Sequence, residues 1–303
     1  MQERCLINGE ESYLEALQNI RNNGKIKENR TGTDTQFLPN IIIEHDMELG
    51  FPILTTKKVA WKTLKVELEG FIGGITDKNW FEDRQCKIWS DWCNPQVVPY
   101  GHDEETQRRM KIESDLGPIY GYQWRRFGRT YTDTYSITEK LSPLYDDLSD
   151  QLATIVRTLR TNPDDRRMVC SAWNPNQLNQ MSLPPCHFSW NLTHCDGILN
   201  LCWTQRSCDM FLGVPFNLAS YGLLLHLLCS IYGFTPGRLT GVLMDAHIYQ
   251  NHFEKINEQI DRTPTELPTI QTVDVDTIFD WDHTKTSLIN YNPQSSIKAD
   301  IAV

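Results

Sequence analysis

Apolar residues recur at helical spacing twice near the start of the chain. In the first segment, residues 12–15 resemble a capping box and Gly24 ends the pattern, and one face is made of Tyr13, Leu14, Leu17 and Ile20. In the second segment, residues 59–71, the shared face is made of Trp61, Leu64, Leu68 and Phe71. Both patterns predict amphipathic helices that pack one face against a core.

The second predicted helix carries two carboxylates. Glu67 borders the apolar face, because it lies three residues after Leu64 and four before Phe71, whereas Glu69 is expected to point away. A carboxylate beside buried apolar side chains is costly unless it has a partner or a task. Glu67 is therefore the first candidate for chemistry.

The remaining patterns predict strands together with one long helix. Strands are predicted at residues 40–45, 168–173, 197–204 and 269–275. A Leu-rich helix, buried on most sides, is predicted at residues 217–232 between Pro215 and Gly233. The mixture predicts an α+β fold.

Length and charge restrict the class of protein. The chain has 303 residues, of which 40% are hydrophobic and 22% charged, and it shows no linker, low-complexity tract or repeat. We therefore expect a single domain over residues 1–303, with a surface insert at about 93–114. The formal net charge of −10 argues against a nucleic-acid binder that relies on overall charge.

The start of the chain and its cysteines favour a cytoplasmic protein. Residues 1–4 lack the apolar run of a secretory signal, and the apolar stretch 223–232 is interrupted by His226 and too short to span a bilayer. The nine cysteines are irregularly spaced and include no Cys-x-x-Cys pair. Neither a disulfide framework nor a metal site is therefore expected.

One cysteine, Cys186, stands in an unusual context. The ordinary interpretation of a cysteine is a small buried hydrophobe. Here Pro184 and Pro185 precede it, which is an uncommon approach to regular secondary structure, and His187 follows with a titrating group. The alternative is a nucleophilic thiolate, which a nearby positive charge makes easier to form.

Four arginines lie in turns or at strand ends: Arg30, Arg166, Arg167 and Arg206. Most arginines are solvated or form weak surface ion pairs. Guanidinium groups also bind phosphate oxygens through paired hydrogen bonds, so the four are candidate ligands of one phosphate.

Five further residues each have an ordinary and a functional interpretation. Asn217 suits a helix N-cap, yet its amide also matches the N3–H and O4 of uracil. His247 and Tyr249 share a strand face, either as a half-buried pair or as ligands of sugar hydroxyls. Trp89 and Trp92 are either core residues or a platform for an aromatic ligand.

Taken together, eight motifs resemble the thymidylate synthase family over nearly the whole chain. They are RTGT at 30–33, FPILTTK at 51–57, DLGPIYG at 115–121, DDRR at 164–167, PPCH at 184–187, QRSCD at 205–209, GVPFN at 213–217 and DAHIY at 245–249. No single motif is specific to the family, whereas the combination is.

The resemblance implies a homodimer whose large mixed sheet lies at the dimer interface and is covered by helices. It implies reductive methylation of dUMP to dTMP, with 5,10-methylenetetrahydrofolate as the donor of the one-carbon unit and the hydride. It implies no metal, no membrane and no obligatory nucleic-acid partner.

The resemblance also implies a role for each matched residue. Cys186 would attack C6 of the uracil, Glu67 would manage proton transfers, and Tyr120 would assist at C5. Asn217 would orient the base, and His247 and Tyr249 would bind the deoxyribose. The phosphate would be held by Arg30, Arg206 and Ser207, together with Arg166 and Arg167 donated across the dimer interface.

The same resemblance implies a folate pocket. Its lining would be Trp89, Trp92, Asp209, Leu212, Gly213 and Phe216. Asp209 would also belong to the catalytic set. The C-terminal residues 301–303, including Ala302, would close over the pocket.

Some positions depart from the family pattern. This chain has Glu69 and Gly70 where the family usually has a Leu-Trp pair, and residues 188–192 and 201–204 are also unusual. The insert after Trp92 is longer than in many members. These changes bear on dimer packing and on the space around the exocyclic methylene of the reaction intermediate.

The principal alternative concerns that methylene. If water rather than hydride captures it, the product is 5-hydroxymethyl-dUMP, as in related viral enzymes. We expect methylation, because Trp89 and residues 302–303, which would shield the intermediate, are retained.

Two other classes of protein are less consistent with the sequence. The joint presence of Cys186, Glu67 and Asn217 argues against a relative that only binds nucleotide or RNA. A cysteine hydrolase would need a histidine base and an oxyanion hole, and no motif beyond His187 supplies either.

Overall fold

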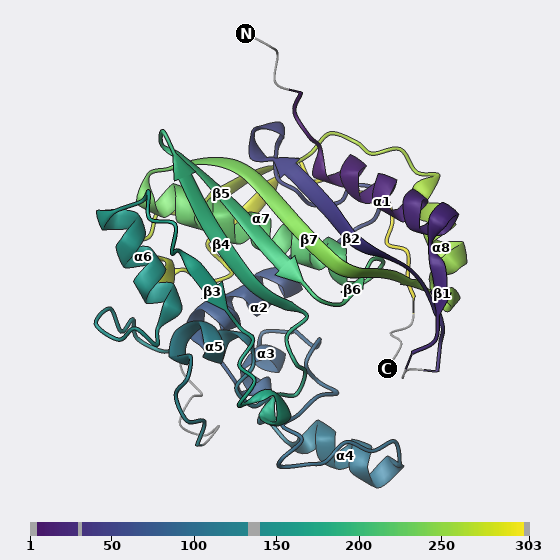
Figure 1. Cartoon of the computed structure of the whole chain (residues 1–303), viewed down its shortest axis with the longest axis horizontal. Coiled ribbons are helices and arrows are strands. Elements are labelled where there is room, and N and C mark those ends of the chain that lie inside the picture. Colours follow the sequence, from purple (N-terminus) through teal and green to yellow (C-terminus); the bar gives the residue numbers. More distant parts are fainter. Residues whose placement is uncertain (1–4, 30–31, 133–139, 300–303) are drawn as a thin grey trace. The chain divides into compact units, whose positions relative to one another are not determined.

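The computed structural model describes residues 5–29, 32–132 and 140–299. The chain divides into two compact units, each built from segments that are distant in the sequence. The first unit comprises residues 1–60, 194–273 and 286–303, and the second comprises residues 61–193 and 274–285. Figure 1 shows the elements of both units.

The first unit is built on a mixed sheet. Its strands are β1 Lys25–Lys27, β2 Thr35–Asp46, β5 Ile198–Gln205, β6 Cys208–Asp209 and β7 Thr235–Tyr249. β2 pairs antiparallel with β1 and β7, whereas β5 and β6 pair parallel with β7. The strands β8 Thr269–Thr272 and β9 Thr286–Ile289 form a separate antiparallel pair. The predicted large mixed sheet is thus confirmed.

Three α-helices and two 3-10 turns accompany this sheet in the described part of the first unit. They are α1 Gly9–Asn23, α7 Gly213–Tyr232 and α8 Phe253–Ile260, with η1 Met47–Leu49 and η4 Gln250–His252. α7 runs along the sheet against β5 and β7, and α1 packs along β2 (Figure 1). Gly233 ends α7 in the left-handed conformation, at φ 80°, which glycine adopts without steric penalty.

α7 is longer than the sequence pattern predicted. It begins at Gly213 rather than at residue 217, because Pro215 fits within the first turn, where its missing N–H costs nothing. At this length α7 is apolar and long enough to cross a membrane. The argument against a membrane span, which considered only residues 223–232, was therefore too narrow. However, 72% of its most apolar window is buried inside the protein, as in the core helix of a soluble protein.

The second unit is mainly helical. Its α-helices are α2 Trp61–Gly73, α3 Lys78–Asp83, α4 Glu104–Ile112, α5 Tyr120–Arg126 and α6 Gln151–Thr161. It also holds the 3-10 turns η3 Leu178–Gln180 and η5 Ile278–Asp280. β3 Val169–Ser171 pairs antiparallel with β4 His187–Cys195, whose last two residues belong to the first unit. α5 contacts α2, α6 and β3 and thereby occupies the middle of this unit.

The apolar faces predicted for the first two helices are buried except for Trp61, which is half-buried, and one helix start was wrong. α1 begins at Gly9, where the Asn8 side chain caps the helix by accepting from the Glu10 N–H at 2.9 Å. Ser12 therefore lies inside the helix rather than at its cap. Glu10, in the first turn, is buried and accepts hydrogen bonds from the backbone and hydroxyl groups of Thr55 and Thr56.

The expected orientation of Glu69 was also wrong. Its side chain is buried, with Oε1 2.9 Å from the Lys140 Nζ and Oε2 2.7 Å from the His283 Nδ1. The His283 backbone N–H donates to the same carboxylate at 2.9 Å. Helical periodicity could not show this, because both partners come from segments far away in the sequence.

Glycine and aromatic residues pack together at two of the positions that depart from the family pattern. A Cβ on Gly70 would lie 2.3 Å from Cε1 of Phe81, so the phenyl ring occupies the space next to this glycine. A Cβ on Gly241 would likewise lie 2.3 Å from Cζ2 of Trp203, and the Trp203 ring stacks on Tyr221 with centroids 5.3 Å apart. Glycine is required at both positions because an aromatic ring fills the adjacent volume.

Candidate active site

The candidate nucleophile lies at the start of a strand in the second unit. Cys186 immediately precedes β4 and is half-buried. Its backbone N–H donates to the Tyr120 hydroxyl oxygen at 2.8 Å. Tyr120 is the first residue of α5, so this hydrogen bond joins the nucleophile loop to the central helix of the unit.

Tyr120 lies within a cluster of rings beside the cysteine. Its ring stacks on His187 and on Phe71, with centroid separations of 4.3 Å and 4.9 Å, and Trp89 meets it edge-on at 6.2 Å. Burial lowers the pKa of His187 to about 3, so the imidazole is neutral near pH 7. His187 is therefore neither the titrating group expected from the sequence nor an effective general base at that pH.

Glu67 has the electrostatics of a proton-transfer group. Burial raises the pKa of its carboxyl to about 7, and the nearby Trp89 partly opposes this shift. The Trp89 indole nitrogen is buried, and among the described residues it has no hydrogen-bond partner of normal geometry. A carboxyl with this pKa can both accept and donate a proton near neutral pH.

The two tryptophans assigned to folate binding have different neighbours. Trp89 is 5% exposed and packs against Tyr120, whereas Trp92 is half-buried and meets Tyr100 edge-on at 5.9 Å. Each indole thus packs against a different tyrosine, and the assignment of both tryptophans to folate stays a prediction.

A second group of candidates lies where β6 leads into α7 in the first unit. Asp209 accepts from the backbone N–H groups of Phe211 and Leu212, at 2.9 Å and 3.1 Å. A Cβ on Gly213 would lie 3.7 Å from the Asp209 Cβ and 3.8 Å from the Asn217 Oδ1, so the three residues adjoin one another. Asn217 belongs to the helix interior and not to its cap, which corrects one of its two interpretations.

One side of the first turns of α7 is only half-buried. Its members are Leu212, Gly213, Phe216 and Asn217. The intervening residues Val214, Pro215, Leu218 and Ala219 are buried in the core. The predicted folate and base ligands of this segment therefore share one accessible stripe of the helix, as i, i+3 and i+4 spacing requires.

The end of β7 brings the predicted ribose ligands beside Asp209. β6 pairs with β7 so that Asp209 lies opposite His247. His247 and Tyr249 are on one face of the strand, as predicted, with ring centroids 5.3 Å apart. Asp245 Oδ1 lies 3.0 Å from the His247 Nδ1, and this interaction is the largest cause that lowers the pKa of Asp245 to about 2.

Sequence reasoning gave no role to Lys57, which lies next to Asp209. The Lys57 ammonium donates to the Phe211 carbonyl and lies over the Phe211 ring, 3.6 Å from its centroid. Burial lowers the pKa of Lys57 to about 7, and the Asp209 carboxylate opposes the shift. The motif at 51–57 gives no indication that Lys57 is buried, so the sequence offered no reason to single out this residue.

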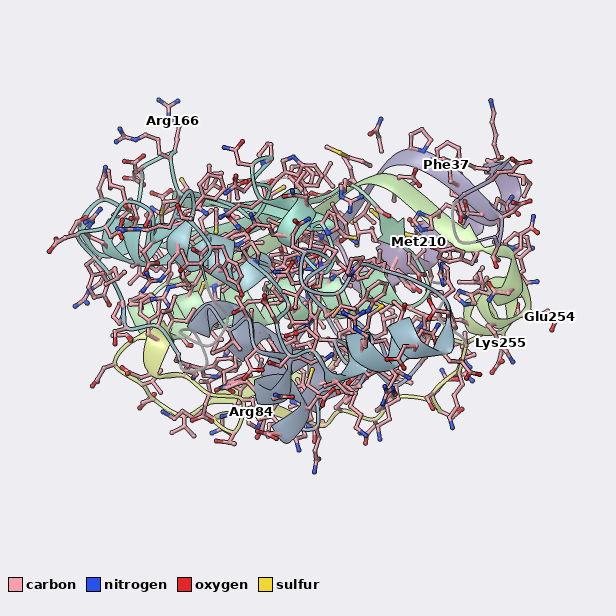
Figure 2. The ribbon with its side chains drawn as sticks, turned by 90° about the horizontal axis from the view of Figure 1, so that it is seen from below. Phe37, Arg84, Arg166, Met210, Glu254 and Lys255 are labelled. Carbon is pink, nitrogen blue, oxygen red and sulfur yellow. The ribbon has the colours of Figure 1, made fainter. Side chains whose placement is uncertain are left out.

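The arginines predicted to bind phosphate have different environments. Arg206 and Ser207 connect β5 to β6 and are half-buried. Arg166 and Arg167 are exposed in the turn before β3, and Figure 2 shows the Arg166 side chain pointing outward. The Arg167 Nη2 lies 2.6 Å from the Asp165 Oδ2, and this pair lowers the pKa of Asp165 to about 2.

Two predicted site residues, Arg30 and Ala302, lie outside the described residues. Within residues 5–29, 32–132 and 140–299, no group of three or more His, Cys, Asp or Glu side chains is arranged to hold a metal ion.

Residues 11–303 match the protein-family model described as Thymidylate synthase. The chain belongs to the thymidylate synthase family. It is therefore a nucleotide-metabolism enzyme, a transferase that acts on dUMP, in a family that uses methylenetetrahydrofolate and is typically dimeric. The match spans segments of both units, while the expectation of a single domain stays a prediction.

Proposed function

We propose that this enzyme methylates dUMP to dTMP, with 5,10-methylenetetrahydrofolate as the donor of both the one-carbon unit and the hydride. The observation that carries the proposal is the hydrogen bond from the Cys186 N–H to Tyr120, in a ring cluster linked through Trp89 to Glu67. It joins a nucleophile, an aromatic environment and a group that can exchange protons near pH 7.

The proposed reaction begins with covalent attack. The Cys186 thiolate adds to C6 of the uracil, and the electron pair of the C5–C6 double bond then makes C5 enolate-like. C5 attacks the one-carbon unit of the folate, loses its proton, and leaves an exocyclic methylene when tetrahydrofolate departs. Hydride from the tetrahydrofolate reduces that methylene, the thiolate is eliminated, and dihydrofolate is the second product.

Residues of both units have roles in this proposal. Glu67 exchanges protons with the pyrimidine through ordered water, and Tyr120 assists proton removal at C5. Asn217 reads the base edge, Asp209 supports the catalytic set and the folate, and His247 and Tyr249 hold the sugar. Arg206 and Ser207 bind the phosphate with Arg30.

The ring cluster favours hydride over water as the trap for the methylene. The rings of Trp89, Tyr120 and Phe71 are buried and pack together beside Cys186, and such dry packing supports exclusion of water from a reactive intermediate. The side-chain volume missing at Gly70 does not create a water-filled space, because Phe81 occupies it.

We further propose a cytoplasmic homodimer in which Arg166 and Arg167 reach the phosphate site of the second subunit. Their exposure in a turn leaves them accessible to another chain. Exposed apolar side chains on the sheet strands of the first unit, Ile26, Ile42 and Met244, provide a surface for such pairing. No membrane or obligatory nucleic-acid partner is part of the proposal.

Mass spectrometry of the nucleotide product tests the reaction. After incubation with dUMP and methylenetetrahydrofolate, we expect the mass of dTMP, and none of this product from a Cys186→Ala variant. A product heavier than dTMP by one oxygen atom would identify 5-hydroxymethyl-dUMP and replace the proposed activity by hydroxymethylation.

A further inference from the structure

Lys78 is a buried cation that the proposed reaction does not use. It is the first residue of α3, and its side chain is fully buried. Its ammonium donates to three carbonyl oxygens, those of Ser90 and Trp92 at 3.2 Å and that of Met110 at 2.8 Å. Because an ammonium has three donors, these bonds use its full capacity and offset the cost of burial.

The three carbonyls belong to two different segments. Ser90 follows Trp89 directly, and Trp92 is itself one of the tryptophans assigned to folate. Met110 belongs to α4 of the insert at residues 93–114. The Met110 side chain is buried with Cys93 and Val98 in a small apolar cluster. Lys78 therefore fixes the insert against the backbone that carries Trp89 and Trp92.

Tyr100 connects the same insert to the loop before the nucleophile. Its hydroxyl lies between the carbonyl of Ser182 and that of Cys93, 3.2 Å from the latter, and its ring meets Trp92 edge-on. Ser182 precedes Cys186 by four residues. A second hydrogen bond, from the Gln96 Nε2 to the Asn179 carbonyl at 3.0 Å, joins the insert to the same loop.

The root of the insert is held as well. The Asn94 N–H and side-chain amide donate to the backbone and carboxylate of Asp115, at 2.6 Å and 2.9 Å. The other Asp115 oxygen accepts from the Gly117 N–H at 2.6 Å, in the turn that leads to Tyr120. Both ends of the insert are thus fixed, and its interior contacts Trp92 and the 179–182 loop.

We propose that the insert at residues 93–114 fixes the position of the residues on the folate-binding side of the active site. Lys78 and Tyr100 are its positioning residues, and they hold Trp92 and the loop before Cys186. The inference rests on the proposed function and on the folate-binding role that the family resemblance implies for Trp89 and Trp92. Both positioning residues contact Trp92, so their loss should weaken folate binding more than dUMP binding.

Two substitutions test the inference, each with a matched control. Lys78→Met removes the ammonium while keeping side-chain length, and Lys25→Met makes the same change at an exposed position of β1. Tyr100→Phe removes only a hydroxyl, and Tyr145→Phe does so at a tyrosine whose ring packs on Phe279 at 6.2 Å in the same unit. The Kd for dUMP is measured by calorimetry, and kcat and KM for methylenetetrahydrofolate by steady-state turnover.

We expect the folate KM to rise about tenfold in Lys78→Met and about threefold in Tyr100→Phe, as for loss of a charged and a neutral hydrogen bond. The dUMP Kd stays within about twofold, and both controls resemble the parent. An unchanged folate KM in Tyr100→Phe, or an equal loss of dUMP and folate affinity in either variant, would overturn the inference. If Lys78→Met does not fold, Tyr100→Phe decides the outcome.

The identity of the product made by the parent enzyme tests the proposed function, whereas the folate KM of the variants tests the positioning role. A hydroxymethylated product would refute methylation, yet the folate KM of each variant relative to the parent would still be measured. An unchanged KM in an enzyme that makes dTMP would refute only the positioning role.

Discussion

At the residue scale, burial gives two ionisable groups of the second unit opposite protonation behaviour. It raises the pKa of Glu67 to about 7 and lowers that of His187 to about 3. Near neutral pH Glu67 therefore exchanges protons readily, whereas His187 serves as a neutral ring that stacks on Tyr120. This difference supports the proposed acid–base role of Glu67, whereas His187 belongs to the ring cluster around Tyr120.

Glu67→Gln should lower kcat by about 10²–10⁴-fold, the usual loss on removing a general acid or base. The pH profile of the parent should show an ionisation near pH 7 that the variant lacks. Steady-state rates across the pH range check this, with Glu104→Gln on the exposed side of α4 as the control. A profile in which the ionisation persists in Glu67→Gln would assign it to another group.

The same pKa predicts how stability depends on pH. The Glu67 carboxyl has a pKa near 7 in the folded protein, compared with an ordinary value of 4.5, so the folded state holds its proton where the unfolded chain has lost it. Stability relative to Glu67→Gln should therefore fall as pH rises from about 4.5 to 7, by on the order of 2–3 kcal/mol in total. Urea unfolding of both proteins at several pH values measures this difference, and a difference independent of pH would contradict it.

At the scale of single elements, α2 shows how a helix accommodates an unusual sequence. Gly70 faces the Phe81 ring, and Glu69 is buried in a pair with Lys140 and His283. Glu69 and Gly70 stand at the two positions where the family usually has leucine and tryptophan. The ion pair surrounds the first of these positions, and the Phe81 ring fills the space beside the second. α2 therefore keeps Glu67 in place with different packing partners.

Gly70→Ala tests the contact with Phe81. The added methyl lies within 2.5 Å of two ring atoms, and such overpacking typically destabilises by about 1–3 kcal/mol. Better helix propensity offsets about 1 kcal/mol of this. Urea unfolding should thus show a net loss, and Phe81→Leu in the same chain should reduce the cost of the methyl. A Gly70→Ala variant as stable as the parent would show that the ring moves freely.

Much of each element followed from its local sequence. The apolar faces of α1 and α2, the alternating burial along β5 and the left-handed Gly233 after α7 all follow from spacing and residue type. The cap at Asn8 and the burial of Glu69 did not follow from local sequence. Each depends on which of several possible groups forms the hydrogen bond or ion pair. The partners of Glu69 come from segments that no local pattern connects to α2.

At the scale of the whole molecule, the proposed reaction draws on residues of both units. The second unit groups Cys186, Tyr120 and Glu67, and the first groups Asp209, Asn217 and His247. Their identity as a set came from the combination of motifs, since no spacing rule relates Cys186 to Asn217. The contacts of Lys57, Lys78 and Tyr100 could not be predicted, because bonds to distant carbonyl oxygens leave no motif in the sequence.

The proposed exchange of arginines between subunits predicts complementation. Cys186→Ala and the double variant Arg166→Ala, Arg167→Ala should each be inactive alone. Refolded together in equal amounts, half of the dimers are mixed and each contains one complete site, so about a quarter of the parent activity should return. Activity that stays absent in the mixture, although mixed dimers form, would contradict donation across the interface.

In the proposed reaction, the sulfur of Cys186 bonds to C6 of the uracil ring during turnover. Denaturing quench of the enzyme with dUMP and methylenetetrahydrofolate, followed by digestion and mass spectrometry, tests it directly. We predict a nucleotide attached to the peptide that contains Cys186, and no turnover by Cys186→Ala. A nucleotide on any of the other eight cysteines, or a Cys186→Ala variant that turns over at the parent rate, would contradict the account.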